Sequence, residues 1–282
     1  MSAAPLPQML MHISDLHFHR LPRRPGRYLS KRALGALNLA LRRRLLFPPE
    51  RARRLVERLA ALEWRHLLIT GDLTHLGTPE EFALARRTLA PLLERGPEAV
   101  TVLPGNHDRY VRERIPGAFE AAFGDFAPPW RDGLATRRLT EHWWLALWDS
   151  ALPAPWFSAA GRVRPETLAA TEAWLAGLPA GARVIVAAHY PVFFPPPHRF
   201  RRNHDLTNQE QVADWLRTHP VRLYLHGHIH HNWVHTVTGH QGPLTAVNSA
   251  SSTQRPRPQD PSAFHRIVLS GPDFHIEPLR VE

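Results

Sequence analysis

Short runs of β-branched and other apolar residues recur along this chain, and segments with helical periodicity separate several of them. The runs that predict strands cover residues 9–13, 66–69, 100–103, 143–148, 184–186, 221–225 and 245–247. Helical patterns follow Pro48-Pro49 and Pro79, and two more cover 168–178 and 208–216. Strands that alternate with helices predict an α/β architecture with largely parallel pairing, and no internal repeat divides the chain. We therefore expect a single domain over residues 1–282.

The composition limits the chemistry that the chain can perform. Its 282 residues, 43% of them hydrophobic, are enough for a large core. The sequence contains no cysteine, which excludes disulfides, thiolate metal sites and a cysteine nucleophile, so any metal must be held by His, Asp, Glu or Asn. The N-terminus lacks a signal-peptide pattern, and no segment reaches the roughly 20 apolar residues that span a bilayer. A soluble, cytoplasmic protein is the expectation.

One segment, at about 20–48, has the character of a basic helical insertion. Residues 20–58 hold thirteen Arg or Lys and two Glu, a net charge of +11 compared with +10 for the whole chain. Ser30 is a suitable N-cap for a helix over 30–46, whose leucines at 34, 37, 41 and 45 share one face. Such a helix packs on its own domain, covers a substrate, or holds the protein peripherally at an anionic membrane surface. The sequence leaves these three alternatives open.

Side chains that bind metal ions follow five of the predicted strands. They are Asp15 and His17 after the first strand, Asp72 after the second, Asn106 after the third, His189 after 184–186, and His228 and His230 after 221–225. The carboxyl ends of strands in an open α/β sheet line one crevice, so we expect all five segments to meet there. Glycines at 71, 105 and 227 directly precede ligand candidates, and each would allow a sharp turn over the strand end.

These motifs resemble a known family. Asp15-Leu16-His17, Gly71-Asp72, Gly105-Asn106-His107-Asp108, His189 and Gly227-His228-Ile229-His230 occur in the order typical of the calcineurin-like metallophosphoesterases, and the resemblance runs from about Met9 to Ser252. It implies an α/β fold in which two mixed β-sheets, flanked by helices, form a four-layer sandwich. It also implies two metal ions. The first would be held by Asp15, His17, Asp72 and His230, and the second by Asp72, Asn106, His189 and His228.

Asp72 would bridge the two ions, and such carboxylate, imidazole and amide ligands suit manganese, iron or zinc. Two ions about 4 Å apart could share a hydroxide, which would be the expected nucleophile for an in-line displacement at phosphorus. His107 cannot easily bind the same ion as its neighbour Asn106, so we assign it to the phosphate, as charge stabiliser or as proton donor to the leaving alkoxide. Asp108 would orient His107. The alternatives are a supporting role of His107 at the metals without catalysis, and a loop hydrogen bond for Asp108.

The substrate is predicted from finer features of the resemblance. The segment 71–75 lacks the Val-Asp-Arg-Gly continuation of the serine/threonine phosphoprotein phosphatases. The full motif order is similar to that of the class III cyclic nucleotide phosphodiesterases. We therefore expect hydrolysis of a small anionic phosphodiester, with 3',5'-cyclic nucleotides as candidates. Arg109 and Arg199 are the candidate substrate-binding residues, with a solvated-loop role as the alternative for each.

Other functions fit parts of the sequence. The basic helix 30–46 also suits a membrane-surface phospholipid or nucleotide-lipid hydrolase. A metal-dependent DNA nuclease would use the +11 segment to bind phosphates, and is disfavoured because few residues follow His230. A non-catalytic scaffold on the same fold is disfavoured because every predicted ligand is present.

Overall fold

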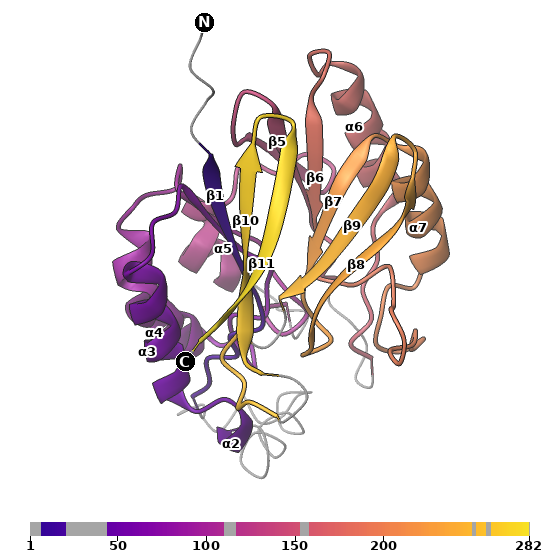
Figure 1. The fold of residues 1–282 in the computed structure, drawn as a ribbon. Helices are drawn as coiled ribbons and strands as arrows, with labels where there is room; N and C mark the ends of the chain where they lie inside the picture. Colours follow the sequence, from indigo (N-terminus) through magenta and orange to yellow (C-terminus); the bar gives the residue numbers. More distant parts are fainter. Residues whose placement is uncertain are drawn as a thin grey trace, which may run out of the picture.

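Two β-sheets pack face to face at the centre of the protein, and helices cover the outer face of each (Figure 1). The structure is a computed structural model that describes residues 7–20, 44–109, 117–152, 158–249, 252–257 and 261–281. This arrangement confirms the expected four-layer sandwich. None of the helices in these ranges is long and apolar enough to span a membrane.

The first sheet has the strand order β11-β10-β1-β2-β3. Its strands are β1 (Gln8–Ile13), β2 (His66–Ile69), β3 (Val100–Val102), β10 (Ala263–Ser270) and β11 (Asp273–Arg280). The pairs β1–β2 and β2–β3 are parallel, whereas β10 is antiparallel to both β1 and β11. The sheet is therefore mixed.

The second sheet has the order β4-β5-β6-β7-β9-β8. Its strands are β4 (Leu134–Arg138), β5 (Trp143–Trp148), β6 (Arg183–Ala187), β7 (Val221–His226), β8 (Asn232–Gly239) and β9 (Gly242–Ser249). The four inner strands are parallel, and the two edge strands β4 and β8 are antiparallel to their neighbours. Parallel pairing thus joins β1, β2 and β3 in the first sheet and the four inner strands of the second, whereas β4, β8, β10 and β11 pair only antiparallel.

The helices lie in two groups on opposite sides of the sheets (Figure 1). The first sheet is covered by α3 (Pro49–Ala60), α4 (Pro79–Leu93), α5 (Ala118–Phe123) and the short 3-10 helix η3 (Gly124–Phe126), and the second by α6 (Pro165–Ala176) and α7 (Gln209–Thr218). The start of α4 is fixed by a capping box, in which Thr78 accepts a hydrogen bond from the Glu81 amide and Glu81 accepts one from the Thr78 amide. Pro79 then occupies the first turn, where its missing N–H costs nothing.

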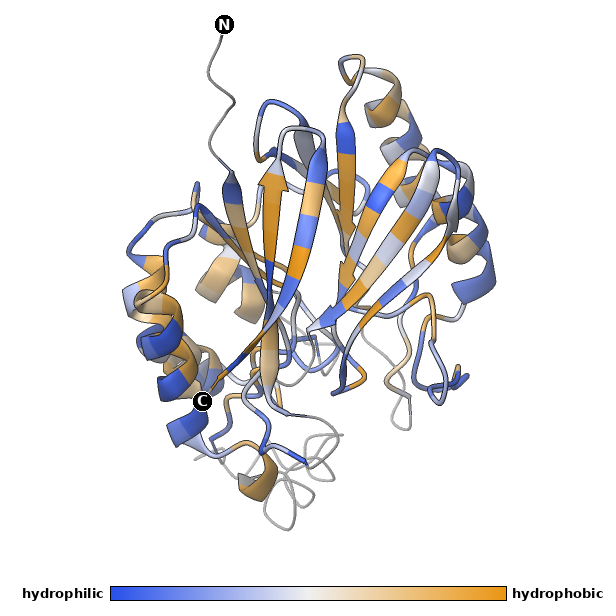
Figure 2. Cartoon of the chain, in the orientation of Figure 1, coloured by the Kyte–Doolittle hydropathy of each residue, from blue (hydrophilic) through white to orange (hydrophobic). Residues whose placement is uncertain are grey.

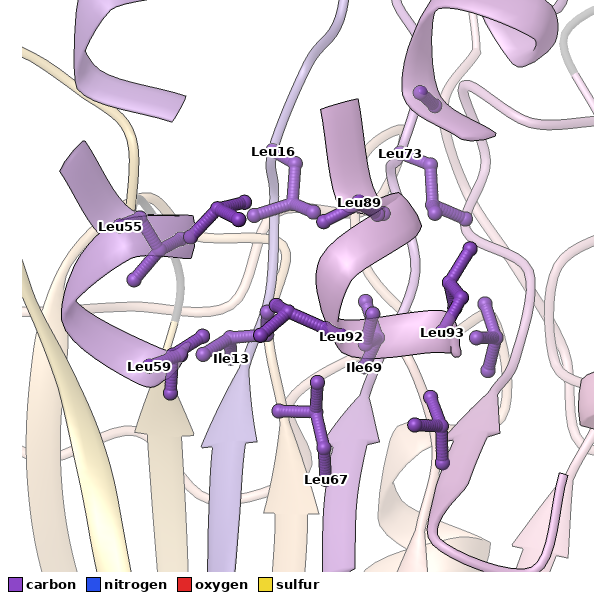
Figure 3. Close-up of a cluster of buried hydrophobic side chains, with 14 of the residues drawn as sticks. Ile13, Leu16, Leu55, Leu59, Leu67, Ile69, Leu73, Leu89, Leu92 and Leu93 are labelled. Carbon is purple, nitrogen blue, oxygen red and sulfur yellow. The ribbon is translucent and has the colours of Figure 1, made fainter. Parts of the chain in front are cut away.

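The alternation of side chains along each strand builds two layers of core at once. In β2, Leu67 and Ile69 point outward to α3 and α4, where they meet Leu55 and Leu89 (Figure 3). Leu68 points the other way, into the apolar layer between the two sheets. Figure 2 shows the same pattern across the molecule, with hydrophobic residues concentrated along the central strands and hydrophilic residues on the outer faces of the helices. Burial on both faces explains why the inner strands read as continuous apolar runs.

Most of one predicted helix lies outside the described residues, and four strands were not predicted. Residues 21–43 lie outside the described residues, so the predicted helix over 30–46 is described only at its end, where Arg44–Leu46 form the helical turn α2. The sequence patterns also missed β4, β8, β10 and β11. Three of these are edge strands, and every residue of β8 and β11 is exposed or half-exposed, which leaves no buried apolar run to detect.

Candidate metal centre

The predicted ligands come together at the carboxyl ends of five strands, with both sheets contributing. The first sheet supplies those that follow β1, β2 and β3, and the second sheet supplies those that follow β6 and β7. The residues are Asp15, His17, Asp72, Asn106, His189, His228 and His230, and all except His230 are buried. The crevice expected from the strand pattern therefore lies at the junction of the two sheets.

Four of these residues form the first group. One ligand atom from each of Asp15, His17, Asp72 and His230 lies within 4.8 Å of the others. The Nε2 atoms of His17 and His230 are 2.9 Å apart, and His230 Nε2 lies 3.3 Å from Asp15 Oδ1. His17 Nε2 is 3.8 Å from Asp72 Oδ2. The group matches the predicted ligand set of the first metal.

The second group shares Asp72 with the first. Asp72 Oδ1 lies 3.5 Å from Nε2 of His189, which in turn is 3.1 Å from Asn106 Oδ1 and 3.2 Å from Nδ1 of His228. The two oxygens of Asp72 thus face different groups, Oδ2 toward His17 and Oδ1 toward His189. The backbone N–H of His107 donates to Oδ1 over 2.8 Å and holds the carboxylate in this orientation. This is the arrangement that a bridging ligand requires.

The imidazole rings are oriented to present a lone pair to the crevice. Nδ1 of His17 faces the carbonyl oxygen of Thr74 at 3.3 Å, and Nδ1 of His189 faces that of Thr70 at 2.8 Å. A nitrogen next to a carbonyl oxygen carries the proton, so the other nitrogen of each ring is the acceptor that can bind a metal. Asp15 Oδ1 is buried and accepts no hydrogen bond. An ion bound between these acceptors would satisfy all of them, so the residues present fit a metal centre.

The backbone at the site is strained in a way seen almost nowhere else in the described residues. Six non-glycine residues in the described part of the chain have positive φ, between 49° and 78°: Asp15, His17, Asp72, Asp132, His228 and His230. Five of the six are predicted ligands. Left-handed backbone at non-glycine residues costs about 1–3 kcal/mol each and collects at functional sites. The strain turns these side chains back over the strand ends.

Two of the three glycines before ligands, Gly105 and Gly227, are needed because other atoms come close to their Cα. Gly71 does have a φ of +97°, but Gly105 and Gly227 do not adopt positive φ. A Cβ on Gly105 would lie 2.2 Å from Asp72 Oδ1, and one on Gly227 would lie 2.3 Å from Asp15 Oδ2. Any larger residue at either position would displace a ligand carboxylate.

The electrostatics of the crevice favour a cation. Burial by itself lowers the pKa of His189, but the negative charge of Asp72 outweighs it and raises that pKa to about 9. Burial raises the pKa of Asp15, yet the nearby imidazole of His230 lowers it below its usual value overall. Burial, followed by the neighbouring His204, lowers the pKa of His228 well below its usual value. Asp15 therefore stays ionised and His228 is the neutral imidazole that a metal ligand must be, whereas His189 would release a proton when an ion binds.

The candidate catalytic residue His107 is oriented by a group other than the predicted one. Its Nδ1 lies 2.7 Å from the carbonyl oxygen of His75, and the two rings stack with centroids 5.1 Å apart. The carboxylate of Asp108 instead accepts hydrogen bonds from the backbone of Leu73, Thr74 and Gly105, and from the Thr74 hydroxyl. The alternative role for Asp108 was a hydrogen bond within the loops, and this is the contact that the structure shows. Asp108 joins the loops after β2 and β3.

The two candidate substrate-binding arginines lie in different settings. The Arg109 guanidinium is 2.7 Å from Glu120 Oε1 and 3.2 Å from Asp149 Oδ2, so two carboxylates balance its charge. Arg199 is exposed on the loop that follows His189. Substrate contact by either residue stays a prediction.

Three further residues adjoin the centre, and sequence reasoning missed two of them, His75 and Asp205. His75 is buried beside His107, and its only signal is its position three residues after Asp72. His204 and Asp205 lie within 4 Å of the predicted ligand His228. They are separated from it by more than twenty residues and belong to no motif, so only the folded chain brings them to the site.

The fold and the site together define a metallophosphoesterase. A family model of calcineurin-like phosphoesterases matches residues 9–232, and the chain belongs to that family. Sequence comparison with curated proteins gives no match.

Solved structures with the same fold include phosphatases. A dimetal phosphatase from Danio rerio is 15% identical, with a TM-score of 0.65 over 98% of this chain and 96% of that one. A purple acid phosphatase from yellow lupin (Lupinus luteus) seeds is 13% identical, with a TM-score of 0.59 over 99% of this chain and 53% of that one. The chain thus spans about half of the lupin enzyme. At these identities the likeness shows the shared fold alone.

Proposed function

We propose that this protein is a dinuclear-metal phosphodiesterase acting on small anionic phosphodiesters, with 3',5'-cyclic nucleotides as candidate substrates. The observation that carries the proposal is the orientation of Asp72, whose two oxygens face two separate ligand groups. One ion would be held by Asp15, His17, Asp72 and His230, and the other by Asp72, Asn106, His189 and His228. When bound, the two ions supply Lewis acidity toward the phosphoryl oxygens and lower the pKa of a water molecule.

The residues of the chain supply the remaining steps. With Nδ1 of His107 held by the His75 carbonyl, Nε2 is the atom of that ring that would contact the phosphate. From there an imidazolium stabilises the charge that develops on the phosphoryl oxygens and donates a proton to the departing alkoxide. The stacked His75 ring and the carbonyl bond keep the His107 ring in one orientation, which lowers the entropic cost of this contact.

The charge balance around the crevice favours a diester over a monoester. A phosphate monoester carries a charge of about −1.5 to −2 at pH 7, whereas a diester carries a single negative charge. Arg109 lies at the end of the Asn106–Asp108 motif, but its charge is balanced by Glu120 and Asp149. It therefore adds little positive potential to offset the second charge of a monoester.

The test compares bis(p-nitrophenyl) phosphate with p-nitrophenyl phosphate, using metal-stripped protein to which manganese is added. We expect faster turnover of the diester, and a loss of about 10²–10⁴-fold in kcat for His107→Ala, the usual contribution of a positioned acid. His240→Ala, at an exposed histidine in the β8–β9 turn, is the matched control and should behave like the wild type. A preference for the monoester would refute the assignment and indicate a phosphatase on the same centre.

A second candidate function rests on an apolar pocket beside the first ligand group. The pocket has a volume of about 220 Å³, and its apolar lining includes Leu16, Phe18, Phe47, Ala52 and Leu84. Phe47 packs its ring against two predicted ligands, 4.6 Å from the ring of His17 and 5.5 Å from that of His230. A pocket of this kind would accept an alkyl chain on the phosphodiester, as in a phospholipid-directed hydrolase.

Residues next to Phe47 in the chain support the same candidate. Leu45 and Leu46 precede Phe47 and are 57% and 37% exposed, and the cationic Arg53 is among the residues that line the pocket. Membrane binding through the segment 30–46 stays a prediction, because that segment lies almost wholly outside the described residues.

Alkyl p-nitrophenyl phosphates of increasing chain length separate the two candidates. If the pocket holds the chain, kcat/KM rises about fourfold for each methylene until the pocket is filled. Leu84→Gln should abolish this dependence, whereas Val234→Gln, an exposed position on β8 away from the pocket, should preserve it. Equal rates for methyl and octyl esters would exclude the lipid-directed alternative.

A further inference from the structure

The loop that follows the ligand His189 returns to the metal centre and places a buried carboxylate there. Asp205 is fully buried, although residues 201–203 before it in the loop are exposed. Its Oδ2 accepts a hydrogen bond from the Arg201 amide over 2.6 Å. Its Oδ1 accepts one from Nδ1 of His204 over 2.9 Å. Both oxygens therefore have donors, and the side chain is fixed.

The same loop contacts the ring of a predicted ligand. His228 Nε2 lies 2.9 Å from both the carbonyl oxygen and the Nδ1 of His204, and 3.7 Å from Asp205 Oδ1. The rings of His204 and His228 have centroids 4.2 Å apart. With its Nε2–H donated to the carbonyl, His228 presents Nδ1 to the crevice, where His189 Nε2 lies 3.2 Å away.

From this geometry we infer that Asp205 is a positioning residue for the second metal, acting on His228 both directly through its charge and by way of His204. The inference rests on the proposed dinuclear centre. A carboxylate behind a metal-bound imidazole fixes its tautomer and ring orientation and makes its other nitrogen a stronger donor. Asp205 supplies that negative charge to His228, and the His204 carbonyl supplies the hydrogen bond. His204 in turn is held in place by its own bond to Asp205.

The same three side chains could instead hold a third ion, since one ligand atom from each lies within 4.8 Å of the others. The hydrogen bonds argue against this. An ion bound to Nε2 of His228 would need that nitrogen to lose its proton, yet the nitrogen faces a backbone carbonyl at 2.9 Å, which only a donor can satisfy. A zinc ion binds a histidine nitrogen at about 2.0–2.1 Å, so an ion on Nε2 of His228 would also have to separate that nitrogen from the His204 carbonyl oxygen. The positioning role needs no rearrangement.

Manganese titration of Asp205→Asn tests the inference. Calorimetry gives the affinity and stoichiometry of both ions, and electron paramagnetic resonance distinguishes a spin-coupled manganese pair from a single ion. We expect the first ion to bind as in the wild type and the second to bind about 10–100-fold more weakly, so that the pair signal forms only with excess metal. Thr207→Val is the matched control, because it removes a hydrogen bond from Thr207 to Gly161 O that anchors the same loop without touching His228.

Several outcomes would overturn the inference. Unchanged affinity for the second ion would exclude a role of Asp205. Binding of three ions to the wild type, falling to two in Asp205→Asn, would assign the residue to a third site. Equal weakening in Thr207→Val, with lower stability of both metal-free variants, would show that only loop stability matters. A wild type that binds a single ion would instead refute the dinuclear centre itself. If Asp205→Asn does not fold, His204→Leu removes the intervening donor and should weaken the second ion in the same way.

Discussion

Replacement of Gly105 by alanine is the sharpest steric test of the bridging role of Asp72. Gly105 lies three residues after β3, directly before the turn at 106–109, and its Cα lies close to Gly71, the neighbour of Asp72. A Cβ there would lie 2.2 Å from Asp72 Oδ1, 2.4 Å from the Asp72 amide nitrogen and 2.8 Å from its Cγ. Because Gly105 does not adopt positive φ, alanine adds no backbone strain, and the effect comes from these contacts alone.

The size of the effect follows from how far the carboxylate must move. An ordinary contact begins at 3.4 Å, so Oδ1 would have to move by about 1.2 Å. Asp72 cannot move freely, since Oδ1 accepts from the His107 amide and the Gly105 amide is itself bound to Asp108. Overpacking of this kind costs about 1–3 kcal/mol of stability. A displacement of about 1 Å at the reacting centre costs roughly 10²-fold in rate.

The assay compares Gly105→Ala with Gly124→Ala, whose added Cβ would meet nothing closer than 3.9 Å. For Gly105→Ala we expect a kcat about 10²-fold below that of the wild type on bis(p-nitrophenyl) phosphate, weaker binding of both manganese ions, and a lower Tm of the metal-free protein. Gly124→Ala should match the wild type in all three. Normal turnover by Gly105→Ala with two ions bound would refute the reasoning, because the bridging oxygen could not then occupy the position that the structure shows.

Three further predictions follow from the same contacts. Asp72→Asn removes the charge shared by both ligand groups, so we expect turnover to fall at least 10²-fold and the stoichiometry of bound manganese to fall below two; retained turnover would favour a different centre. Burial raises the pKa of Glu81 from 4.5 to about 7, so the folded state holds a proton that the unfolded state loses as the pH rises between these values. Stability should therefore fall by about 3 kcal/mol over that window, and the fall should be absent in Glu81→Gln when urea unfolding of the two proteins is compared at each pH. Arg109→Met leaves Glu120 and Asp149 without their cation, so we expect lower stability with an unchanged KM for the diester; a KM raised tenfold or more would instead establish the substrate contact predicted from the sequence.

The metal-binding motifs were predictable from the sequence because each follows directly on an apolar strand. In β2 every residue of His66–Ile69 is buried, so the run is visible and Asp72 stands at its end. The strand β11 shows the opposite case. Its burial alternates, it contains Pro278, and it pairs with β10 at the edge of the first sheet, so no apolar run marks it.

Contacts made across long stretches of chain were not predictable. His107 is oriented by the carbonyl of His75, and a backbone carbonyl leaves no trace in residue identity. Asp205 reaches His228 only because the loop after β6 folds back toward the end of β7. The predicted ligands could thus be identified from motifs that follow the strands, whereas the groups that orient them depend on the path of the loops between the strands.

The position of the centre between the two sheets links its chemistry to the stability of the fold. The first ligand group takes Asp15, His17 and Asp72 from the first sheet and His230 from the second. The second group takes its ligands from both sheets as well, and Asp72 is common to the two. Each ion would therefore join the sheets at the end where the apolar layer between them gives way to buried carboxylates and imidazoles. The strained backbone and the closely packed polar groups at this end lower the stability of the metal-free chain. Binding of an ion to the folded state alone raises the free energy of unfolding by about 2.7 kcal/mol when the ion is present at 100 times its Kd. The sequence thus tolerates an unfavourable arrangement at the ends of its strands because two bound cations would make the same arrangement favourable.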